Sequence, residues 1–251
     1  MSEPELSVVL PCFNEREAVG PLTAELHAAL QRTGRSFEIV FVDDCSTDGS
    51  REVLRELHEK YPELRVIEHA VNCGESAAQA TGFRNARGAV VITMDSDGQN
   101  DPADIPRLLA ALGDGGLDCV SGVRRTREDD WLRRISSRIA NRFRAALTGE
   151  GVSDAGCTYR ALRRHALREV PVWNGMHRFL PTMLRAQGYA IGEIEVHHRP
   201  RVTGQSKYGV GNRLWRGILD CLAMRWYQAR VVPGRRTSGE TAPARSEARH
   251  G

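Results

Sequence analysis

The chain has 251 residues, of which 41% are hydrophobic and 27% are charged. This composition is that of an ordinary soluble globular protein, and it excludes collagen-like, coiled-coil and low-complexity chains. The net charge of +3 hides an asymmetry, because residues 1–120 carry 10 basic and 21 acidic groups whereas residues 121–251 carry 25 and 11. The second half therefore suits an anionic partner such as nucleic acid, a phosphorylated substrate or an anionic membrane, unless it is a solvated basic face.

The six cysteines are scattered and form no CxxC pair. This spacing argues against a zinc site and against a dense disulfide framework. No apolar run approaches the roughly 18–20 residues that a membrane helix needs, and the N-terminal segment lacks the features of a signal peptide. We therefore expect a cytoplasmic protein with reduced thiols, whose contact with a membrane is peripheral.

The first half alternates short apolar runs with helical patterns. We expect strands at 6–10, 37–42, 66–68, 89–94 and 117–122, and helices at 15–31, 48–61, 75–87 and 102–112. Strands that are separated by helices form βαβ units. The pattern predicts an α/β fold with a Rossmann-like, mainly parallel sheet and helices on both faces.

The second half is less regular. We expect helices at 131–147, 176–187 and 211–230, strands at 157–162 and 189–197, and a loop at 199–211. The segment after Pro233 lacks apolar periodicity, which is typical of a disordered tail. We predict one domain over residues 1–232 and a tail at 233–251.

Polar clusters follow four of the expected strands, with the sequences CFNE, DDCSTDG, NCGES and DSDGQ. Ligands bind beyond the carboxyl ends of parallel strands, so this placement predicts a ligand site without reference to any family. Asp95 and Asp97 directly follow a buried strand and can converge on a hard cation such as Mg²⁺ or Mn²⁺. The alternative to a metal site, for an isolated DxD triplet, is a pair of solvent-exposed acidic side chains in a turn.

The order and spacing of these clusters resemble those of family 2 glycosyltransferases with the A-type nucleotide-sugar fold. The branch that they resemble most is the dolichyl-phosphate-mannose-synthase-like one, which includes bacterial polyprenyl-phosphate glycosyltransferases. The resemblance covers roughly residues 5–230. It implies a nucleotide-sugar-binding half at 1–122 and an acceptor-binding half at 123–232 of one catalytic domain.

The resemblance also implies roles for the residues that follow the strands of the first half. The donor is expected to be a UDP- or GDP-sugar, and a divalent cation, Mg²⁺ or Mn²⁺, is expected beside its diphosphate. The residues expected to bind the donor are Pro11, Asn14, Glu15, Asp44, Gly74, Asp95, Ser96 and Asp97. Those expected to hold the metal are Asp95, Asp97 and Gln99.

A polyprenyl- or dolichyl-phosphate acceptor is the further implication, with inversion at the anomeric carbon. Such a phosphate is already an anion and needs no strong general base, and arginine forks suit its oxygens. The catalytic set carried over from the family motifs comprises Asp95, Asp97, Arg124, Arg133, Ser137, Asp154, Arg201 and Lys207. Within it, Arg201 and Lys207 belong to the segment RVTGQSKY, which matches the family's mobile loop over the phosphates.

Other functions remain open. A glycosyltransferase of the same fold with a soluble or saccharide acceptor would need a base, for which Asp154 is the candidate. A nucleotidyltransferase would need a glycine–arginine phosphate loop, and a dinucleotide-binding oxidoreductase would need GxGxxG where this chain has PCFNER. The intact DSDGQ cluster argues against a non-catalytic nucleotide-binding module, and no nucleic-acid-binding motif is recognised.

The segment 211–230 combines arginines with an apolar stripe at four-residue spacing. It suits either a membrane interface or a small membrane subunit, but we favour packing of the stripe on the domain or on a partner. The expected place of work is the inner face of the cell membrane, and a homodimer is left open. His177 and Trp173 are candidates to line the sugar or lipid path, although ordinary packing is the interpretation that we favour.

Overall fold

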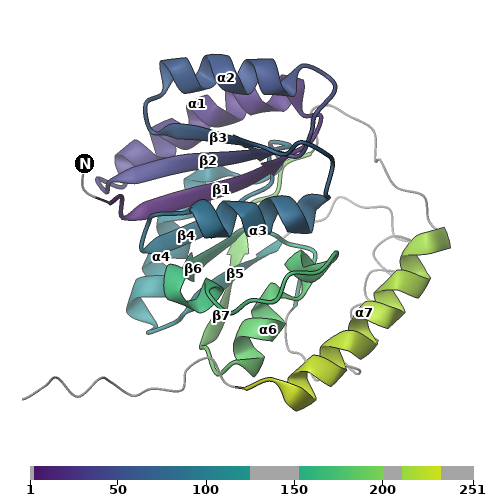
Figure 1. The fold of residues 1–251 in the computed structure, drawn as a ribbon. Helices are drawn as coiled ribbons and strands as arrows, with labels where there is room; N and C mark the ends of the chain where they lie inside the picture. The colour runs from purple at the N-terminus through teal and green to yellow at the C-terminus, as the bar shows by residue number, and fades with distance from the viewer. Residues whose placement is uncertain (1–2, 125–152, 201–210, 233–251) are drawn as a thin grey trace, which may run out of the picture.

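The computed structural model describes residues 3–124, 153–200 and 211–232, with only the backbone for 211–216 (Figure 1). A seven-stranded sheet has the order β3-β2-β1-β4-β6-β5-β7. The strands are β1 (Leu6–Cys12), β2 (Phe37–Asp43), β3 (Leu64–Glu68), β4 (Val90–Thr93), β5 (Cys119–Arg124), β6 (Arg160–Arg163) and β7 (Ile191–Val196).

The α-helices alternate with these strands in the first half. They are α1 (Arg16–Arg32), α2 (Ser50–Lys60), α3 (Glu75–Asn85), α4 (Ile105–Asp114), α6 (Leu180–Ala186) and α7 (Gly211–Arg230). Short 3₁₀ turns are η1 (Pro102–Asp104), η2 (Arg164–Leu167) and η3 (Met176–Arg178).

The sheet is mainly parallel, as predicted. β1 pairs in parallel with β2 and β4, β2 with β3, and β5 with β7. β6 is the exception among the described strands, because it runs antiparallel to both β4 and β5. The carboxyl ends of β1, β2, β4 and β5 therefore share one edge of the sheet with the start of β6.

Helical layers cover both faces of the sheet, which confirms the predicted architecture (Figure 1). Leu6, Val8 and Leu10 of β1 belong to a core that also contains apolar side chains of α1, α2 and α4. Val9 belongs to the opposite core, with side chains of α3, α6 and α7. A central strand that is buried on both faces needs a continuous apolar run, which is why β1 shows no polar alternation.

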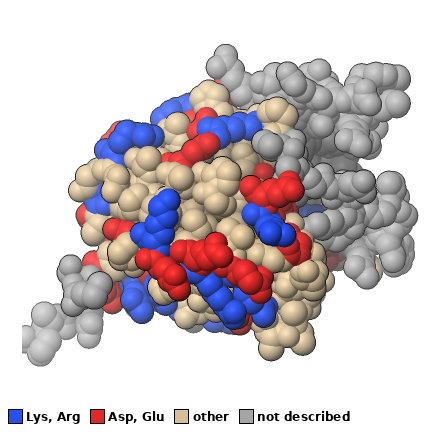
Figure 2. Space-filling view, turned by 90° about the horizontal axis from the view of Figure 1, so that it is seen from above, with Lys and Arg blue, Asp and Glu red and all other residues tan. Residues whose placement is uncertain are grey.

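The outer surface of the layer formed by α1 and α2 carries both acidic and basic side chains. Seen over α1 and α2, acidic and basic side chains are interspersed (Figure 2). Arg55 of α2, for example, forms two hydrogen bonds of 2.8 Å to the carboxylate of Glu68. On this face, the acidic excess of the first half does not form one continuous patch.

Two of the predicted helices are interrupted. The segment predicted at 176–187 divides into η3 and α6, and the segment at 102–112 divides into η1 and α4. Pro181 explains the first division: inside a helix begun at Met176 it would lose a hydrogen bond, whereas in the first turn of α6 its missing N–H has no cost. The predicted helix at 131–147 and the tail at 233–251 lie outside the described residues.

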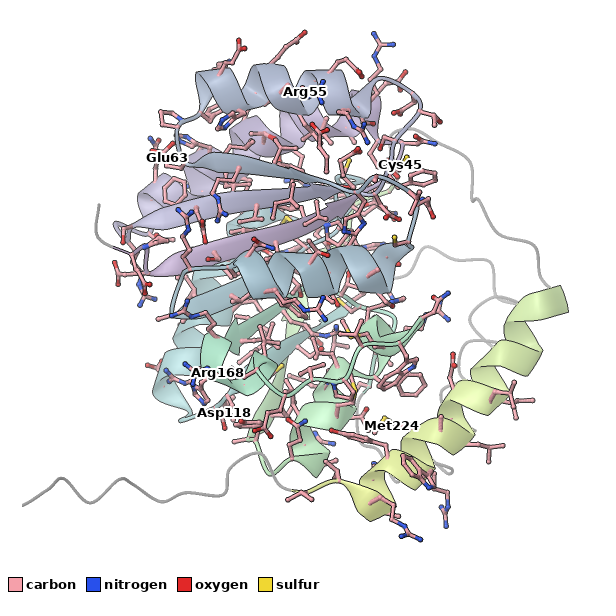
Figure 3. All side chains as sticks on the ribbon, viewed as in Figure 1. Cys45, Arg55, Glu63, Asp118, Arg168 and Met224 are labelled. Atoms are coloured by element: carbon pink, nitrogen blue, oxygen red, sulfur yellow. The ribbon has the colours of Figure 1, made fainter. Side chains whose placement is uncertain are left out.

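One side of helix α7 packs against the core that also contains side chains of α3 and α6. Cys221 and Met224 are buried in that core, and Figure 3 shows Met224 on the side of α7 that faces α6. By contrast, Leu222 and Trp226 of the predicted stripe are 49% and 67% exposed. The stripe was predicted to pack on the domain or on a partner, and these two side chains do not pack on the described part of the domain. None of the described helices is both long and apolar enough to span a bilayer.

Candidate active site

The polar segments predicted from the sequence meet at one edge of the sheet. The register pairs Cys12 with Asp43 at the ends of β1 and β2, and Thr93 of β4 with Arg160 of β6. The loops that follow β1, β2 and β4 consequently emerge side by side. β5 ends at the same edge with Arg124, so acidic and basic candidates face a common region.

The loop after β4 is fixed to its surroundings by short hydrogen bonds. The hydroxyl of Ser96 donates to the carbonyl of Pro11 in β1 at 2.7 Å, and the amide of Asp95 donates to Oδ1 of Asn100 at 3.1 Å. Asp97 accepts from the amide of Gln99 at 3.1 Å, which closes a turn within the loop. The two carboxylates are thus presented by a rigid turn.

Asp95 and Asp97 lie close enough to repel one another. Burial, and then the charge of Asp97, raises the pKa of Asp95 to about 6. Thr158 opposes this shift, because its hydroxyl donates to Oδ1 of Asp95 at 2.5 Å. A divalent cation would relieve the repulsion between the two carboxylates, so these residues fit a metal electrostatically.

Gln99 supplies the third predicted metal ligand. Its side-chain nitrogen donates to the carbonyl of Arg199 at 3.3 Å, which leaves Oε1 as the atom that could coordinate a metal. Carboxylate and amide oxygens are hard ligands, which Mg²⁺ and Mn²⁺ accept and which suit zinc less well. The donor set therefore matches the expected cations.

A third carboxylate, Glu75, stands in the first turn of α3. Partial burial, followed by the charge of Asp95, raises the pKa of Glu75 to about 7. Gly74 of the NCGES cluster was predicted as a site residue, whereas Glu75 was not. Glu75 could have been predicted as a site residue from its position at the start of the helix that follows β3.

Arg124 and Asp154 form a two-bond ion pair. Nε of Arg124 donates to Oδ2 of Asp154 at 2.6 Å, and Nη2 donates to Oδ1 at 2.7 Å. A guanidinium has five N–H groups, so three remain for another anion. Asp154 is engaged through both oxygens, an arrangement that is unfavourable for a general base.

The loops after β1 and β2 are joined through Asn14. Its side-chain oxygen accepts from the amide of Thr47 at 2.7 Å, and its own amide donates to Oγ of Ser46 at 2.9 Å. The amide of Glu15 likewise donates to Oγ of Ser50 at 2.8 Å. Asn14 and Glu15 thus fix the geometry of both loops, and their contact with a nucleoside stays a prediction.

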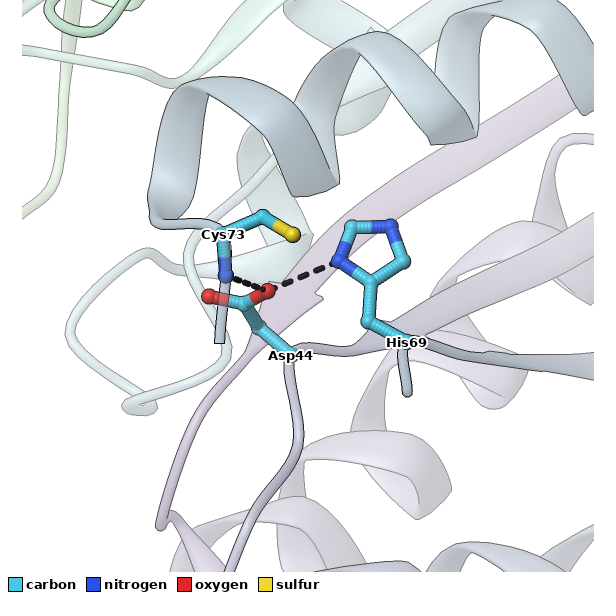
Figure 4. Close-up of side chains that lie close together, drawn as sticks. All are labelled: Asp44, His69 and Cys73. Atoms are coloured by element: carbon cyan, nitrogen blue, oxygen red, sulfur yellow. Dashed lines mark hydrogen bonds and ion pairs between the residues drawn. The ribbon is translucent and has the colours of Figure 1, made fainter. Parts of the chain in front are cut away.

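Asp44 anchors the loop that precedes α3 (Figure 4). Oδ1 accepts from the amide of Cys73 at 2.8 Å, and Oδ2 accepts from the amide of Gly74 at 2.7 Å. Gly74 has φ +87° and ψ 161°, a conformation that is essentially restricted to glycine. Asp44 and Gly74 therefore shape the entrance to α3, and their expected role in donor binding stays a prediction.

Asp44, His69 and Cys73 offer ligand atoms that all lie within 4.8 Å of one another. Nδ1 of His69 is 2.7 Å from Oδ1 of Asp44, and Nε2 is 2.9 Å from Oγ1 of Thr81. Since a carboxylate only accepts, Nδ1 of His69 donates to Asp44, while the hydroxyl of Thr81 can either donate to Nε2 or accept from it. Both ring nitrogens are satisfied, so the cluster is explained as a structural hydrogen-bond network without a metal.

A family model described as glycosyl transferase family 2 matches residues 7–171, which is more than half of the chain. The chain belongs to glycosyltransferase family 2. The predicted family is therefore confirmed.

Curated relatives of this glycosyltransferase include two bacterial proteins. A dodecaprenyl-phosphate galacturonate synthase from Rhizobium johnstonii is 38% identical over 227 residues, covering 89% of this chain and 67% of the relative. An undecaprenyl-phosphate 4-deoxy-4-formamido-L-arabinose transferase from Edwardsiella ictaluri is 38% identical over 207 residues, covering 82% and 63%. The chain spans about two thirds of the length of these relatives.

Solved structures share the A-type fold. Glucosyl-3-phosphoglycerate synthase from Mycobacterium tuberculosis, in complex with Mn²⁺ and UDP-glucose, gives a TM-score of 0.68 at 20% identity and covers 90% of this chain and 79% of its own. A mannosyltransferase from Pyrobaculum calidifontis, in complex with GDP-mannose and Mn²⁺, gives 0.60 at 19% identity and covers 94% and 68%. At these identities, the likeness confirms the fold of the family 2 chain and nothing finer.

Several predicted residues of this glycosyltransferase lie outside the described residues. These are Arg133, Ser137, Arg201 and Lys207. The structure thus brings together the expected donor and metal residues, and it places Arg124 and Asp154 at the same edge of the sheet. The acceptor-phosphate contacts assigned to the other four residues stay predictions.

Proposed function

We propose that this glycosyltransferase transfers a sugar from a UDP- or GDP-sugar to the phosphate of a polyprenyl lipid, with inversion at the anomeric carbon. The observation that carries this proposal is the juxtaposition of Asp95 and Asp97 with the Arg124–Asp154 pair at one edge of the sheet. The names of the curated relatives support it, because they describe transfer to or synthesis on polyprenyl phosphates.

Asp95, Asp97 and Gln99 are the residues that would hold Mg²⁺ or Mn²⁺. The bound cation would neutralise the departing nucleoside diphosphate. The chain's own contribution is to hold the two carboxylates on a rigid turn. Ser96 and Asn100 provide that rigidity through their hydrogen bonds to β1 and to the loop itself.

In the proposed reaction, an oxygen of the lipid phosphate attacks the anomeric carbon and forms the new C–O bond. The bond from that carbon to the donor diphosphate breaks, and the nucleoside diphosphate leaves with the electron pair. No proton needs to be removed from an anionic phosphate. The remaining N–H groups of Arg124 can orient it, and Arg133, Ser137, Arg201 and Lys207 are assigned further phosphate contacts by resemblance.

The state of Asp154 counts against the alternative with a soluble hydroxyl acceptor. A hydroxyl nucleophile needs a base, and Asp154 was the candidate for that role. Its two oxygens already accept the two hydrogen bonds from Arg124. Using Asp154 as a base would cost this ion pair, whereas a phosphate acceptor leaves it intact.

We further propose peripheral contact with the inner face of the cell membrane, where a polyprenyl phosphate would be found. The outer face of α7 carries Leu219, Leu222 and Trp226 at exposed positions. Arg230 ends the same helix. Apolar and aromatic side chains combined with arginine suit the interface of an anionic bilayer or a small membrane subunit.

A donor screen tests the proposed function. The purified chain is incubated with radiolabelled UDP- and GDP-sugars, polyprenyl phosphate, and Mg²⁺ or Mn²⁺, and the products are extracted into organic solvent. We expect label in the organic phase only when donor, lipid phosphate and cation are all present. Transfer only to a water-soluble acceptor would contradict the proposal.

A further inference from the structure

A chain of polar contacts lies beside the three carboxylates and is not used by the reaction described above. Oγ of Ser76 in α3 is 2.8 Å from Nδ1 of His177, and it accepts from the amide of Gly175 at 2.9 Å. Nε2 of the same imidazole is 3.6 Å from Oε2 of Glu75. These contacts link the first turn of α3 to the turn that contains η3, across about a hundred residues of sequence.

The contacts favour one tautomer of His177. A carboxylate oxygen of Glu75 faces Nε2 and can only accept, so the ring proton belongs on Nε2. Nδ1 then accepts from the hydroxyl of Ser76, whose oxygen is held by Gly175. Burial lowers the pKa of His177 to about 3, in agreement with a neutral ring. His177 therefore turns its Nε2 toward Glu75 at 3.6 Å, which is an electrostatic contact longer than a hydrogen bond.

The backbone carbonyl of His177 is also fixed by a buried arginine. Arg160 is fully buried, and its Nη1 donates to the carbonyl of His177 at 2.8 Å. Its Nε donates to Oγ of Ser121 in β5 at 3.3 Å. Because Arg160 belongs to β6 and also binds Ser121 of β5, its bond to the carbonyl of His177 ties the turn at η3 to the sheet. This tie restricts movement of the turn and therefore of the His177 ring.

Glu75 stands in the first turn of α3, at the same edge of the sheet as the candidate site. It follows Gly74, which Asp44 anchors, and its side chain is 42% exposed. The charged groups that act on it are Asp95 and Asp97, which are negative, and Arg178 and Arg160, which are positive. Glu75 is thus electrostatically coupled to the two aspartates that are expected beside the donor diphosphate, and the sugar is attached to that diphosphate.

We propose that Glu75 is a specificity-determining residue that accepts hydrogen bonds from hydroxyl groups of the donor sugar, with His177 as its positioning residue. This inference rests on the proposed function and narrows its substrate class to uncharged sugars. Above its raised pKa of about 7, Glu75 is a carboxylate that accepts from hydroxyl groups on both oxygens and repels the carboxylate of a uronic acid. Binding is therefore compared at about pH 8.5, where Glu75 is ionised. The names of the relatives include one uronic acid, so they do not decide between the two classes.

Binding of matched donors tests this assignment without catalysis. Displacement of a labelled nucleoside diphosphate is measured for UDP-galactose and UDP-galacturonate, and for GDP-mannose and GDP-mannuronate. The comparison is made with the UDP pair or the GDP pair, according to which nucleotide the protein binds. We expect the wild-type protein to prefer the uncharged sugar by at least about tenfold, equivalent to about 1.4 kcal/mol. An equal or stronger affinity for the uronate would overturn the proposal.

The variants separate a sugar contact from a structural role. In Glu75→Gln, we expect the ratio of affinities for the uncharged donor and the uronate donor to fall about tenfold. The affinity for the free nucleoside diphosphate should change less than about twofold. His177→Phe should reduce the preference, and His177→Gln, which retains an N–H near Nε2, should restore part of it. Glu56→Gln, at an exposed position of α2, is the matched control and should leave the preference unchanged.

Two results would contradict the role of Glu75. One is an unchanged preference in Glu75→Gln, and the other is an equal loss of affinity for the sugar nucleotide and the free nucleoside diphosphate. Circular dichroism confirms folding of each variant before binding is measured. Failure of the proposed function is distinct, because it would show as absent transfer to polyprenyl phosphate with the sugar preference intact.

Discussion

Arg124 and Asp154 meet as a fork, with Nε–Oδ2 and Nη2–Oδ1 distances of 2.6 and 2.7 Å. The side chains are only 12% and 13% exposed, so each charge depends on the other for compensation. The pair fixes the Arg124 guanidinium at the end of β5, and the remaining N–H groups of that guanidinium can meet a phosphate. It thereby joins two members of the predicted catalytic set that lie 30 residues apart in the sequence.

Arg124→Lys keeps the charge but removes the fork. We expect acceptor-dependent kcat/KM to fall at least about tenfold, because a lysine ammonium cannot hold Asp154 and a phosphate in the same geometry. Nucleotide affinity should change less than about twofold. Steady-state kinetics with varied polyprenyl phosphate, together with nucleotide titration, provide the measurement.

Arg55→Lys is the matched control, since Arg55 makes a similar fork to Glu68 away from the candidate site. We expect that variant to retain wild-type kinetics. Equal acceptor kinetics in Arg124→Lys and the wild-type protein would remove Arg124 from the acceptor site.

Metal dependence follows from the crowding of Asp95 and Asp97. Excess chelator should abolish transfer, and Mg²⁺ or Mn²⁺ should restore it. Asp97→Asn should reduce kcat by about 100-fold or more, because charge stabilisation by a metal is worth several kcal/mol. Asp114→Asn, at an exposed position in the last turn of α4, is the control. Full turnover in excess chelator would refute the role of the metal.

The strands of the first half could be predicted because their sequences reflect the fold directly. β1 and β2 are mostly apolar on both faces, apart from the hydrogen-bonded pair Ser7 and Glu38, and β2 ends at Asp43, one residue beyond the expected boundary. β6 was harder to place. It has four residues and runs antiparallel, and its sequence RALR carries no signal for direction or for its start at Arg160.

The site was predictable in its location but not in its contacts. Motif order placed Asp44 at a strand end, but not the backbone amides that its carboxylate binds. The link between Ser76 and His177 depends on tertiary packing over a long sequence separation, which no local pattern encodes. In α7, apolar residues occur on more than one side, so periodicity alone could not show that Met224 is buried and Trp226 exposed.

His177 should make stability depend on pH. The pKa of this ring is about 3 in the folded protein, against 6.5 for an ordinary histidine, because burial disfavours the charged form. Between these values the unfolded chain binds more protons, so stability falls as pH decreases below about 6.5, with a slope approaching about 1.4 kcal/mol per pH unit. Above about pH 7 this contribution should be constant.

Urea unfolding of the wild-type protein and His177→Gln between pH 5 and 7.5 isolates this effect, since the other titrating groups are common to both. We expect the wild-type stability to decrease more steeply with falling pH than that of the variant. Parallel pH dependences would show that His177 is not held neutral in the folded protein.

The outer face of α7 leads to a prediction about membranes. Leu222 and Trp226 are exposed on this helix, and apolar and aromatic side chains gain free energy when they enter the interfacial region of a bilayer. An arginine close to an anionic surface adds about 1 kcal/mol, and salt screens this attraction. We therefore expect the protein to float with anionic liposomes at low salt and to dissociate at high salt.

A double variant, Leu222→Gln with Trp226→Ser, should weaken flotation by about tenfold without unfolding the protein, because neither side chain contributes to the core. Val71→Ser, which changes an exposed apolar residue between β3 and α3, is the matched control. Flotation with native membranes but not with protein-free liposomes would instead indicate that α7 contacts a membrane subunit. Unchanged flotation of the double variant on anionic liposomes would show that a different surface docks, since the apolar contribution of α7 would then be absent.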